Sequence, residues 1–467
     1  MNRRSFLKSA GSAACAATLS LRAATPSTKQ KPNIVVLLTD QQSADSTSNR
    51  IGSKYVYTPN MDRLAANGTS FTRAYCANPI CVPSRNSMFT GRYPTETGII
   101  DNGGLATAHL DPQRFPMMGK IFERGGYSTA YFGKWHLACP EEETNVHGFR
   151  TMATTVNDDT AAAAAAAGFL QEKHDAPFLM IASFLNPHNI CEWARGQRLP
   201  LGAIGQPPPL DECPPLLPNH APQNHEPGIM ALTRRSYQDS PMFPVGGFDE
   251  KKWREYRWAY YRLIEKADAQ IGIVLQALRR SGLEENTLIV FLSDHGDCQG
   301  AHEWNQKTVF YDEAARVPLV ISQRGAIPPG ISTRLVNTGI DLIPTLCDYA
   351  DIPIPSTLPG LSLRNSTNDP RKYVVASNKM VQGAPVDGRV PTPSGRMLRS
   401  RHYKYCVYDE GKQRESLVDM EKDPGEMTNL AGDLHFHDEL TQHRAMLTVW
   451  CSKTHDTFPI PTAQQES

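Results

Sequence analysis

The segment "CVPSRNSMFTGR", from Cys81 to Arg92, combines a cysteine with an arginine four residues later. Pro83 suits the first position of a helix and Gly91 suits the position just past its end, so a short helix is predicted here. Cys81 then lies at the helix amino terminus, where unpaired N–H groups and the helix dipole favour negative charge. Arg85 shares the same face. The segment predicts an anion site built around a sulfur atom or a group that replaces it.

Polar residues also follow four apolar, β-branched segments, which are Asn33 to Leu38, Ser128 to Phe132, Phe178 to Leu185 and Thr287 to Leu292. Such strands, alternating with helical segments, indicate a largely parallel sheet that is covered on both faces. Ligands bind beyond the carboxyl ends of the strands in these sheets. We therefore expect one rim to carry the residues that follow the four segments, namely Asp40, Lys134, His136, His188, Asp294 and His295.

The carboxylates of Asp40 and Asp294 suit a hard cation such as Ca²⁺. An unmodified Cys81 at a helix terminus would have a lowered pKa and could act as a nucleophile. A thiolate is nevertheless a poor partner for a hard cation. An oxygen-bearing group would therefore fit position 81 better than the thiol.

The apolar strand segments and the helical segments between them predict an α/β fold, with a large, mostly parallel central sheet sandwiched by helices. Helical segments include "MDRLAANG", the seven-alanine run 161–167 and the long segment 251–280. After about Pro370 the pattern changes to short strands with turns and a final helix near His437 to Cys451, which predicts a smaller C-terminal α+β subdomain. We expect an export signal (1–24), a catalytic domain (25–369) and a C-terminal subdomain (370–467).

A Pro-rich segment at about 189–248, which includes "QPPPLDECPPLLPNHAP", interrupts the predicted catalytic domain. It is too long for a plain connection, and loops of this length usually serve as functional lids or are disordered. Because it leaves the predicted rim at His188, we expect it to shape the substrate site.

The amino-terminal segment "NRRSFLK", followed by a weakly apolar run to Leu21, indicates an export signal. Its paired Arg3 and Arg4 resemble a twin-arginine signal, with a general secretion signal as the alternative. Cleavage is expected near Ala23 or Ala24, and the location would be a bacterial periplasm or the extracellular space. No other stretch is long and apolar enough to span a bilayer, so we expect a soluble mature protein.

The charge balance and the cysteines exclude several classes of site. The 48 Lys and Arg balance the 48 Asp and Glu, so no overall field favours nucleic acid or an anionic membrane. Nine of the ten cysteines lie beyond the signal and form no CxxC pair, which argues against a zinc site. In a chain that folds before export, we expect most of them to be buried thiols.

The segment around Cys81 resembles the signature of type I sulfatases, which belong to the alkaline phosphatase superfamily. In that signature, Cys-x-Pro-Ser-Arg followed by Thr-Gly-Arg directs oxidation of the cysteine to formylglycine. Further segments resemble the family in the same order between about Pro32 and Leu430: "PNIVVLLTDQ", "TPNMDRLAANGTSFTRAYC", "GKWHL", "NPHN", "SDHGDCQGAHEWNQKTVFYDEAARVPLVI" and "LVDMEKDPGEMTN". The resemblance implies hydrolysis of a sulfate ester. With the cationic rim and the export signal, it leads us to expect a sulfated saccharide as substrate.

The resemblance also implies a nucleophile and a metal site. A formylglycine-generating enzyme would convert Cys81 to formylglycine, whose hydrated form, a geminal diol, attacks sulfur. Asp40, Asp294 and His295 would bind one divalent cation, usually Ca²⁺ in this family. The diol at position 81 and Gln41 would supply further oxygen ligands.

Five more residues carry roles that the resemblance implies. Arg85 would stabilise the helix-end site, and Lys134 and Lys307 would neutralise the sulfate oxygens. His136 would hold or deprotonate the second diol hydroxyl. His188 is our choice for the acid near the leaving oxygen, with Lys307 as the alternative.

Two positions keep other functions open. Gln41 and His295 stand where many animal sulfatases have an aspartate and an asparagine, and this version also resembles the phosphonate monoester hydrolases. The alternatives are a phosphonate or phosphate diester hydrolase and a non-catalytic protein that binds sulfated glycans. The residues carry no signal for an oligomeric state, for the sugar or for its sulfate position.

The remaining basic residues and histidines have simpler interpretations. The basic stretch Arg396, Arg399, Arg401 and Lys404 is expected to form a solvated strand face, with contact to an anionic substrate as the alternative. We expect a structural hydrogen-bonding role for His302. We expect surface or loop positions for His109, His147, His220 and His225.

Overall fold

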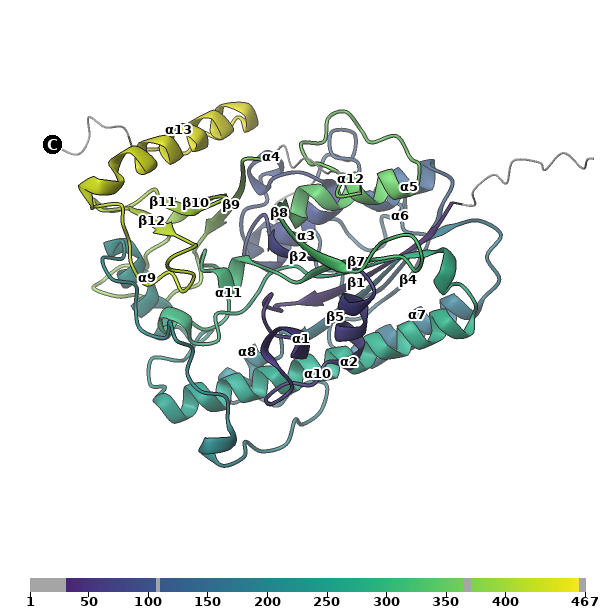
Figure 1. Ribbon diagram of the computed structural model, residues 1–467, viewed down its shortest axis with the longest axis horizontal. Helices are drawn as coiled ribbons and strands as arrows, with labels where there is room; N and C mark the ends of the chain where they lie inside the picture. Colours follow the sequence, from purple (N-terminus) through teal and green to yellow (C-terminus); the bar gives the residue numbers. More distant parts are fainter. Residues whose placement is uncertain (1–30, 106–109, 365–370, 462–467) are drawn as a thin grey trace, which may run out of the picture. The chain divides into compact units, whose positions relative to one another are not determined.

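The computed structural model describes residues 31–105, 110–364 and 371–461 of the 467-residue chain. The predicted export signal at 1–24 and His109 lie outside the described residues. An eight-stranded sheet forms the larger part of the fold, in the order β4-β3-β5-β1-β6-β7-β2-β8 (Figure 1). Its strands are β1 (Asn33–Asp40), β2 (Thr69–Tyr75), β3 (Ser128–Gly133), β4 (Thr151–Thr154), β5 (Phe178–Pro187), β6 (Thr287–Ser293), β7 (Leu319–Ser322) and β8 (Gly330–Asn337).

The central strands of this sheet run parallel. β1 pairs in parallel with β5 and β6, and β3 pairs in parallel with β4 and β5. β7 runs antiparallel to both of its neighbours, β6 and β2. The register places Leu38 opposite Ser183 and Leu292, so β1, β5 and β6 end at the same edge. The predicted α/β class with a mostly parallel sheet is confirmed.

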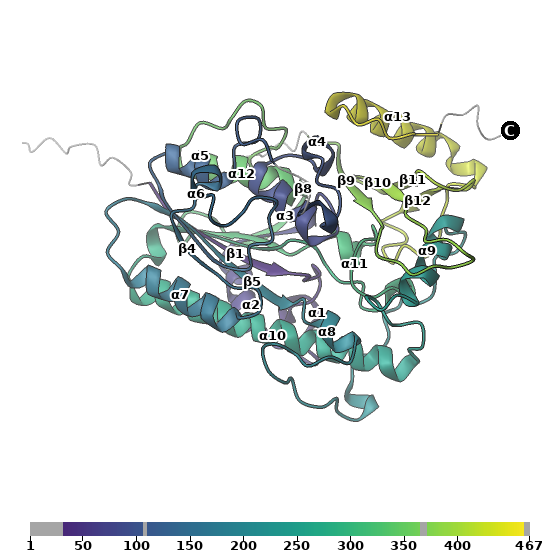
Figure 2. The same ribbon diagram turned by 180° about the vertical axis from the view of Figure 1, so that it is seen from behind.

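Helices cover both faces of the eight-stranded sheet. Helices α2 (Pro59–Ala66), α7 (Asp159–Gln171) and α10 (Glu250–Arg280) lie on one face, and α3 (Cys81–Thr90), α5 (Met118–Arg124) and α12 (Thr338–Tyr349) lie on the other (Figures 1 and 2). Alternate residues of each strand enter the two layers. In β1, Val35 and Leu37 join the core under α10, while Val36 and Leu38 join the core under α3 and α12. This alternation explains why the strands are apolar throughout.

A second, four-stranded antiparallel sheet in the order β12-β11-β10-β9 follows in the chain. Its strands are β9 (Tyr373–Lys379), β10 (Ser394–Ser400), β11 (Tyr403–Tyr408) and β12 (Glu415–Asp419). One face packs on α13 (His437–Thr454), and Leu398 and Val407 contribute to that core. The other face packs on α9 (Gly228–Gln238) and on Phe310 of the segment that carries Lys307. The predicted small C-terminal sheet and helix are confirmed.

Shorter helices complete the described fold. They are α1 (Ser48–Ile51), α4 (Pro94–Thr97), α6 (Thr144–His147), α8 (Ile190–Ala194) and α11 (Asp312–Ala315). The Pro-rich segment 189–248 therefore contains helices α8 and α9 as well as extended chain. No helix in the described ranges is both long enough and apolar enough to cross a membrane.

One predicted helix boundary was wrong. Helix α3 begins at Cys81, so Pro83 is its third residue and not its first. Ile80 is the N-cap with extended backbone angles, and the amide of Ser84 donates to its carbonyl. The N–H groups before Ser84 have no acceptor within the helix, so the N–H missing from Pro83 still costs nothing. Gly91 ends the helix in the left-handed region at φ 67°, as predicted.

The predicted solvated basic face was wrong for three of its four residues, whereas Arg401 is exposed. Arg396, Arg399 and Lys404 are buried, because the C-terminal sheet is covered on both faces. Arg396 pairs with Asp456 at 2.6 Å, and Lys404 pairs with two carboxylates. These cations stabilise the interior and are not available to a substrate.

The structure also gives the positions of His147, His302 and the cysteines. His147 is buried and not on the surface, since its Nδ1 accepts the amide of Phe149 and its Nε2 donates to the carbonyl of Glu141. His302 is buried with its ring 3.8 Å from that of Tyr311. All nine cysteines in the described part of the chain are buried and free, as predicted: Cys76, Cys81, Cys139, Cys191, Cys213, Cys298, Cys347, Cys406 and Cys451.

Candidate active site

Four neighbouring strands deliver most of the predicted site residues to one edge of the sheet. Asp40 ends β1, Lys134 follows β3, His188 follows β5 and Asp294 follows β6. These strands are consecutive in the sheet order. The carboxyl ends of parallel strands therefore gather residues that lie up to 254 positions apart in the chain, as the pattern of apolar runs predicts.

The sulfur of Cys81 lies at the centre of this edge. It is fully buried at the start of α3. Lys307 Nζ lies 3.1 Å from Cys81 Sγ, His295 Nε2 lies 3.2 Å away and Asp40 Oδ1 lies 3.8 Å away. Cations and carboxylates thus surround one side-chain position.

Arg85 connects the two carboxylates from one turn further along α3. Its Nε donates to Asp294 Oδ2 at 2.9 Å, and its Nη2 donates to Asp40 Oδ2 at 3.3 Å. Its Nη1 donates to the carbonyl of Lys134 and to Ser183 Oγ. All three charged side chains are fully buried, so this pairing is required to keep the carboxylates ionised inside the protein.

The charges around Cys81 determine its ionisation. Burial alone would raise the pKa of the thiol, but Lys134, Lys307 and His295 together lower it well below its usual value. Burial would lower the pKa of His295, but the Asp294 carboxylate raises it. The site therefore stabilises negative charge at position 81.

The two carboxylates differ in their ionisation. Burial and the nearby Asp40 carboxylate raise the pKa of Asp294 to about 6, against the opposing effect of His295 and Arg85. Burial and Cys81 would also raise the pKa of Asp40, but Lys134, His188 and Arg85 lower it overall. The Lys134 ammonium lies 2.5 Å from Asp40 Oδ2. A further cation beside Asp294 would relieve the repulsion between the two acids.

The donor atoms fit a divalent cation. Ligand atoms of Asp40, Cys81, Asp294 and His295 all lie within 4.8 Å of one another. His295 Nδ1 donates to the carbonyl of Gly296 at 3.0 Å, which leaves the lone pair of Nε2 directed at the site. Two carboxylates and an imidazole suit a divalent cation, and an oxygen at position 81 would make the set harder than the thiol does.

Gln41 and Lys307 lie beside this donor set. The Gln41 side-chain oxygen accepts a hydrogen bond from Lys307 Nζ at 2.7 Å, so it points toward the ammonium. The side-chain nitrogen of Gln41 donates to Asp297 Oδ2 at 2.8 Å. The Gln41 amide oxygen is thus already hydrogen-bonded, and service as a metal ligand would use its second lone pair.

His136 and His188 form the solvent side of the site. They are partly exposed, whereas the other predicted site residues are buried. Burial, Lys307 and Lys134 lower the pKa of His188 to about 4, and burial also lowers the pKa of His136. Cys81 opposes both shifts, which reflects the closeness of the two imidazoles to the sulfur. These lowered pKa values favour the neutral form of both rings.

Backbone strain is concentrated at this edge of the sheet. Gln41, His136, Gln306 and Thr308 have positive φ angles of 70°, 53°, 60° and 82°. These angles are unfavourable for residues with a Cβ, and most of all for a β-branched threonine. Lys134 and His136 therefore do not lie in one extended segment, because His136 is in the left-handed region. The His136 side chain nevertheless faces Cys81, and the Lys134 side chain faces Asp40.

Three supporting residues were not identified from the sequence. Ser183 binds Arg85, Tyr260 donates to the carbonyl of Gln41 at 2.7 Å, and Asp297 accepts from the Gln41 side chain. Asp297 is a second carboxylate three residues after Asp294, which is a signal that the sequence does contain. Tyr260 lies in the middle of α10, and no local pattern distinguishes it from a core tyrosine.

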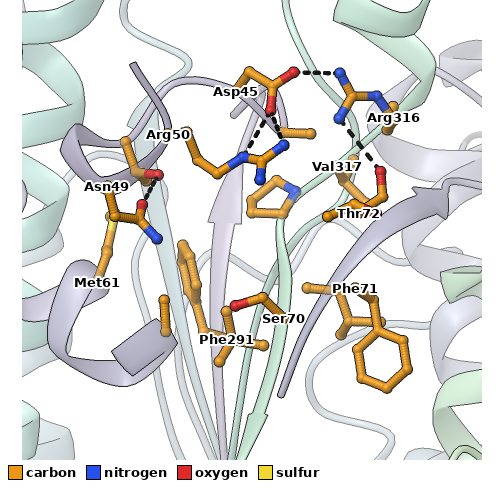
Figure 3. A pocket seen from close by; sticks show the side chains of 16 residues that line it. Asp45, Asn49, Arg50, Met61, Ser70, Phe71, Thr72, Phe291, Arg316 and Val317 are labelled. Atoms are coloured by element: carbon orange, nitrogen blue, oxygen red, sulfur yellow. Dashed lines mark hydrogen bonds and ion pairs between the residues drawn. The ribbon is translucent and has the colours of Figure 1, made fainter. Parts of the chain in front are cut away.

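A separate pocket contains none of the predicted site residues (Figure 3). It lies between the segment after β1 and strands β2 and β7. Its charged residues are already paired, since Asp45 binds both Arg50 and Arg316. The pocket therefore offers no free charge for a ligand, in contrast to the edge around Cys81.

Residues 32–352 match the profile of the family described as Sulfatase, which is more than half of the chain. The chain belongs to the sulfatase family. Residues 300–449 of this sulfatase also match a domain described as N-sulphoglucosamine sulphohydrolase, C-terminal. The chain is a sulfuric ester hydrolase, and the prediction of a sulfatase is confirmed.

Curated relatives match nearly the whole sulfatase. A Delta 4,5-hexuronate-2-O-sulfatase of Bacteroides thetaiotaomicron is 29% identical over 462 residues, which cover 94% of this chain and 93% of that protein. An ulvan-active sulfatase of Formosa agariphila is also 29% identical and covers 92% of this chain and 82% of its own.

Solved structures give the same picture of the fold. A 2-O GAG sulfatase superposes with a TM-score of 0.79 at 28% identity, over 91% of this chain and 93% of that chain. A phosphonate monoester hydrolase from Silicibacter pomeroyi superposes with a TM-score of 0.72 at 20% identity, over 91% of this chain and 96% of that chain. The second likeness concerns the fold alone.

Proposed function

We propose that this sulfatase removes sulfate from a sulfated saccharide, using an oxidised Cys81 as nucleophile and one Ca²⁺ ion. The observation that carries the proposal is the place of the Cys81 sulfur, with Lys307 at 3.1 Å and with the donor atoms of Asp40, Asp294 and His295 inside the same 4.8 Å cluster. The saccharide class is supported by relatives that are named for hexuronate and ulvan sulfatases.

Formylglycine at position 81 would place oxygen where the structure has sulfur. When present in its hydrated form, it supplies an oxygen nucleophile and a second hydroxyl through which sulfate is released. Asp40, Asp294, His295 and Gln41 would hold Ca²⁺, which supplies a Lewis acid beside that oxygen. Arg85 keeps both aspartates in place through its contacts at 2.9 and 3.3 Å.

The cationic side chains would bind the sulfate group. Arg85 pairs with Asp40 and Asp294, Lys134 pairs with Asp40, and Lys307 lies beside position 81. Lys134 and Lys307 reach the centre of the site and would neutralise the charge that moves onto the sulfate oxygens. His136 would accept the proton of the second hydroxyl, because its lowered pKa leaves its imidazole neutral.

Two residues could donate the proton to the leaving oxygen. The pKa of His188 at about 4 leaves its imidazole neutral at pH 7 in the free protein, whereas the Cys81 thiolate helps to raise the pKa of Lys307 despite its burial. His188 becomes a donor when the negative charge of a bound ester raises its pKa. Lys307 already carries a proton and is the alternative.

The direct test measures release of inorganic sulfate from sulfated unsaturated hexuronate disaccharides by protein whose Cys81 peptide has been checked by mass spectrometry. We expect release by the formylglycine form, loss of release with a chelator and its return with Ca²⁺. Verified formylglycine protein that releases no sulfate from any sulfated saccharide or aryl sulfate would contradict the proposal. If only the thiol is found in protein from the native cell, a glycan-binding function would be favoured.

The competing hydrolase is tested on matched esters. We expect a higher kcat/KM for an aryl sulfate than for the corresponding aryl phosphonate. The reverse preference would identify a phosphonate hydrolase on the same fold.

We also propose that a formylglycine-generating enzyme modifies the chain and that the twin-arginine route exports it to the periplasm or beyond. Arg3 and Arg4 support the route. Replacing both with lysine should leave the precursor in the cytoplasm, as judged by cell fractionation. Unchanged export of that variant would show that another route is used.

A further inference from the structure

Asp297 is a fully buried carboxylate beside the site that has no part in the chemistry described above. Its Oδ2 accepts from Gln41 Nε2 at 2.8 Å and from the Tyr256 hydroxyl at 2.9 Å. Its Oδ1 accepts from the amide of Gln299 at 2.8 Å. Each oxygen of Asp297 therefore faces hydrogen-bond donors.

The Gln41 amide bridges Asp297 and Lys307. An ionised carboxylate only accepts hydrogen bonds, and an ammonium group only donates them. Between these two neighbours, the Gln41 nitrogen must face Asp297 and its oxygen must face Lys307. The opposite orientation would place two acceptors together at one end and two donors together at the other.

Other contacts hold the Gln41 backbone but leave the side-chain orientation open. The amide of Gln41 donates to Asp294 Oδ1 at 3.1 Å, and Tyr260 donates to its carbonyl. Lys307 itself lies between Gln306 and Thr308, which both have strained backbone angles. Among the described residues, the Lys307 ammonium group has two hydrogen-bond partners, which are Gln41 and Cys81.

We propose that Asp297 is a positioning residue for sulfate ester hydrolysis. It fixes the polarity of the Gln41 amide, and through that amide it directs the Lys307 ammonium toward position 81. It also presents the Gln41 oxygen to the proposed Ca²⁺ ligand set, and this second effect rests on the proposed function.

The test compares the single variant Asp297→Asn with a double variant that exchanges the carboxylate and the amide between positions 297 and 41. In Asp297→Asn, the new amide can accept from Gln41 or from Gln299 but not from both, so one donor is left facing a donor. In the double variant Asp297→Asn with Gln41→Glu, the amide nitrogen introduced at position 297 donates to the carboxylate introduced at position 41. The amide oxygen, at the place of Oδ1, still accepts from Gln299 and from the Tyr256 hydroxyl, which lies 3.2 Å from Oδ1. The other oxygen of that new carboxylate accepts from Lys307, and the summed charge of the two positions is unchanged.

We expect Asp297→Asn to lower kcat on an aryl sulfate by about 10- to 100-fold and to weaken Ca²⁺ binding, measured by calorimetry, by about 10-fold. The double variant should recover at least about half of the logarithmic loss in kcat. Tyr256→Phe removes another donor to Asp297 but leaves the Gln41 contact, so its kcat should stay within about 3-fold of the wild type. Gln41→Met should lose about as much kcat as Asp297→Asn.

Three results would overturn the proposal. They are a wild-type kcat in Asp297→Asn, a loss that the double variant does not relieve, and a loss in Tyr256→Phe as large as that in Asp297→Asn. If Asp297→Asn does not fold, as judged by its thermal transition, Gln41→Met and the folded double variant decide the question. If the wild-type protein binds no Ca²⁺, the proposed metal fails, and the kcat comparison still decides the role of Asp297.

Discussion

Among the buried lysines of this sulfatase, Lys307 and Lys404 both have carboxylates nearby, but of these two only Lys307 lies in the site. Lys307 lies at the carboxyl edge of the large sheet and contacts Gln41 and Cys81. Lys404 lies in the small sheet, where its Nζ donates to Asp312 at 2.5 Å, to Glu426 at 2.6 Å and to the carbonyl of Phe310 at 3.0 Å. Both side chains are almost completely buried.

The difference between the two clusters is the capacity for a further ligand. All three protons of Lys404 have partners, so that cluster is closed. Lys307 has two hydrogen-bond partners among the described residues, and one of them is the Cys81 thiol, whose pKa is lowered. The Lys307 cluster also reaches solvent through His136 and His188. Buried charge alone therefore does not identify a catalytic site, whereas unsatisfied donors beside a partly exposed pair of imidazoles do.

The largest effect on kcat is expected when the cysteine beside Lys307 is replaced. Cys81→Ala should lower kcat for sulfate release by at least about 10⁴-fold, because the group at position 81 is the proposed nucleophile. Cys406, buried in the small sheet, provides the control. Cys406→Ala should leave kcat unchanged and lower the free energy of unfolding by about 1–2 kcal/mol. Equal activity of Cys81→Ala and the wild type in a sulfate-release assay would reject the proposed nucleophile.

Replacing Lys307 should reduce activity, whereas replacing Lys404 should reduce stability. Lys307→Met should lower kcat/KM by about 10²- to 10³-fold, since it removes a cation from the charge that develops on sulfate. Lys404→Met leaves Glu426 buried without its cation and Asp312 with Arg316 alone, so it should lower the free energy of unfolding by about 3–5 kcal/mol. Urea unfolding and steady-state kinetics on both variants make the comparison. A large loss of kcat in folded Lys404→Met would show that the closed cluster also supports catalysis.

Glu426 makes the closed cluster sensitive to pH. Burial raises its pKa from 4.5 to about 7, although Lys404 opposes the shift. The folded protein therefore holds a proton that the unfolded chain has lost, and the resulting stability is greatest below pH 4.5 and is lost as pH rises through 7. Relative to Glu426→Gln, the wild type should lose on the order of 3 kcal/mol over this range. Urea unfolding at several pH values checks this, with the exposed Glu142→Gln as control.

The smallest expected effect lies where the two regions meet. Asn378 of β9 donates to the carbonyl of Thr308, next to Lys307, at 2.5 Å. Asn378→Ala should lower kcat by about 3- to 10-fold, because Lys307 loses part of its support. Asn429 also bridges backbone carbonyls around the small sheet, but it donates to Glu415 and His225. Asn429→Ala should leave kcat unchanged, and equal kinetics of the two variants would show that β9 does not position Lys307.

The sequence predicts those parts of the site that depend on strand ends. Asp40, Lys134, His188 and Asp294 each lie at or just beyond the end of a continuous apolar run, and such runs form buried parallel strands almost regardless of their surroundings. The helix of Cys81 was also predicted, and its end at Gly91 is marked locally, although it begins two residues before Pro83. These features need no knowledge of distant contacts.

The features that the sequence does not predict depend on long-range contacts. The segment of Lys307 is contacted by a sheet whose strand β9 begins 66 residues later in the chain, and the strained angles at Gln306 and Thr308 lie in this segment. The basic residues of β10 and β11 were expected in solvent, since nothing local shows that α9 covers that face. The orientation of Gln41 likewise depends on Asp297, which lies 256 residues away.

The complete burial of Cys81 has a consequence for the time at which it can be modified. In the finished fold the sulfur is fully buried and lies against Lys307, which follows 226 residues later. At typical rates of synthesis, the ribosome needs roughly 10–45 s to add those residues. Any enzyme that modifies Cys81 therefore has its best access to the growing chain, before Lys307 is in place beside the sulfur.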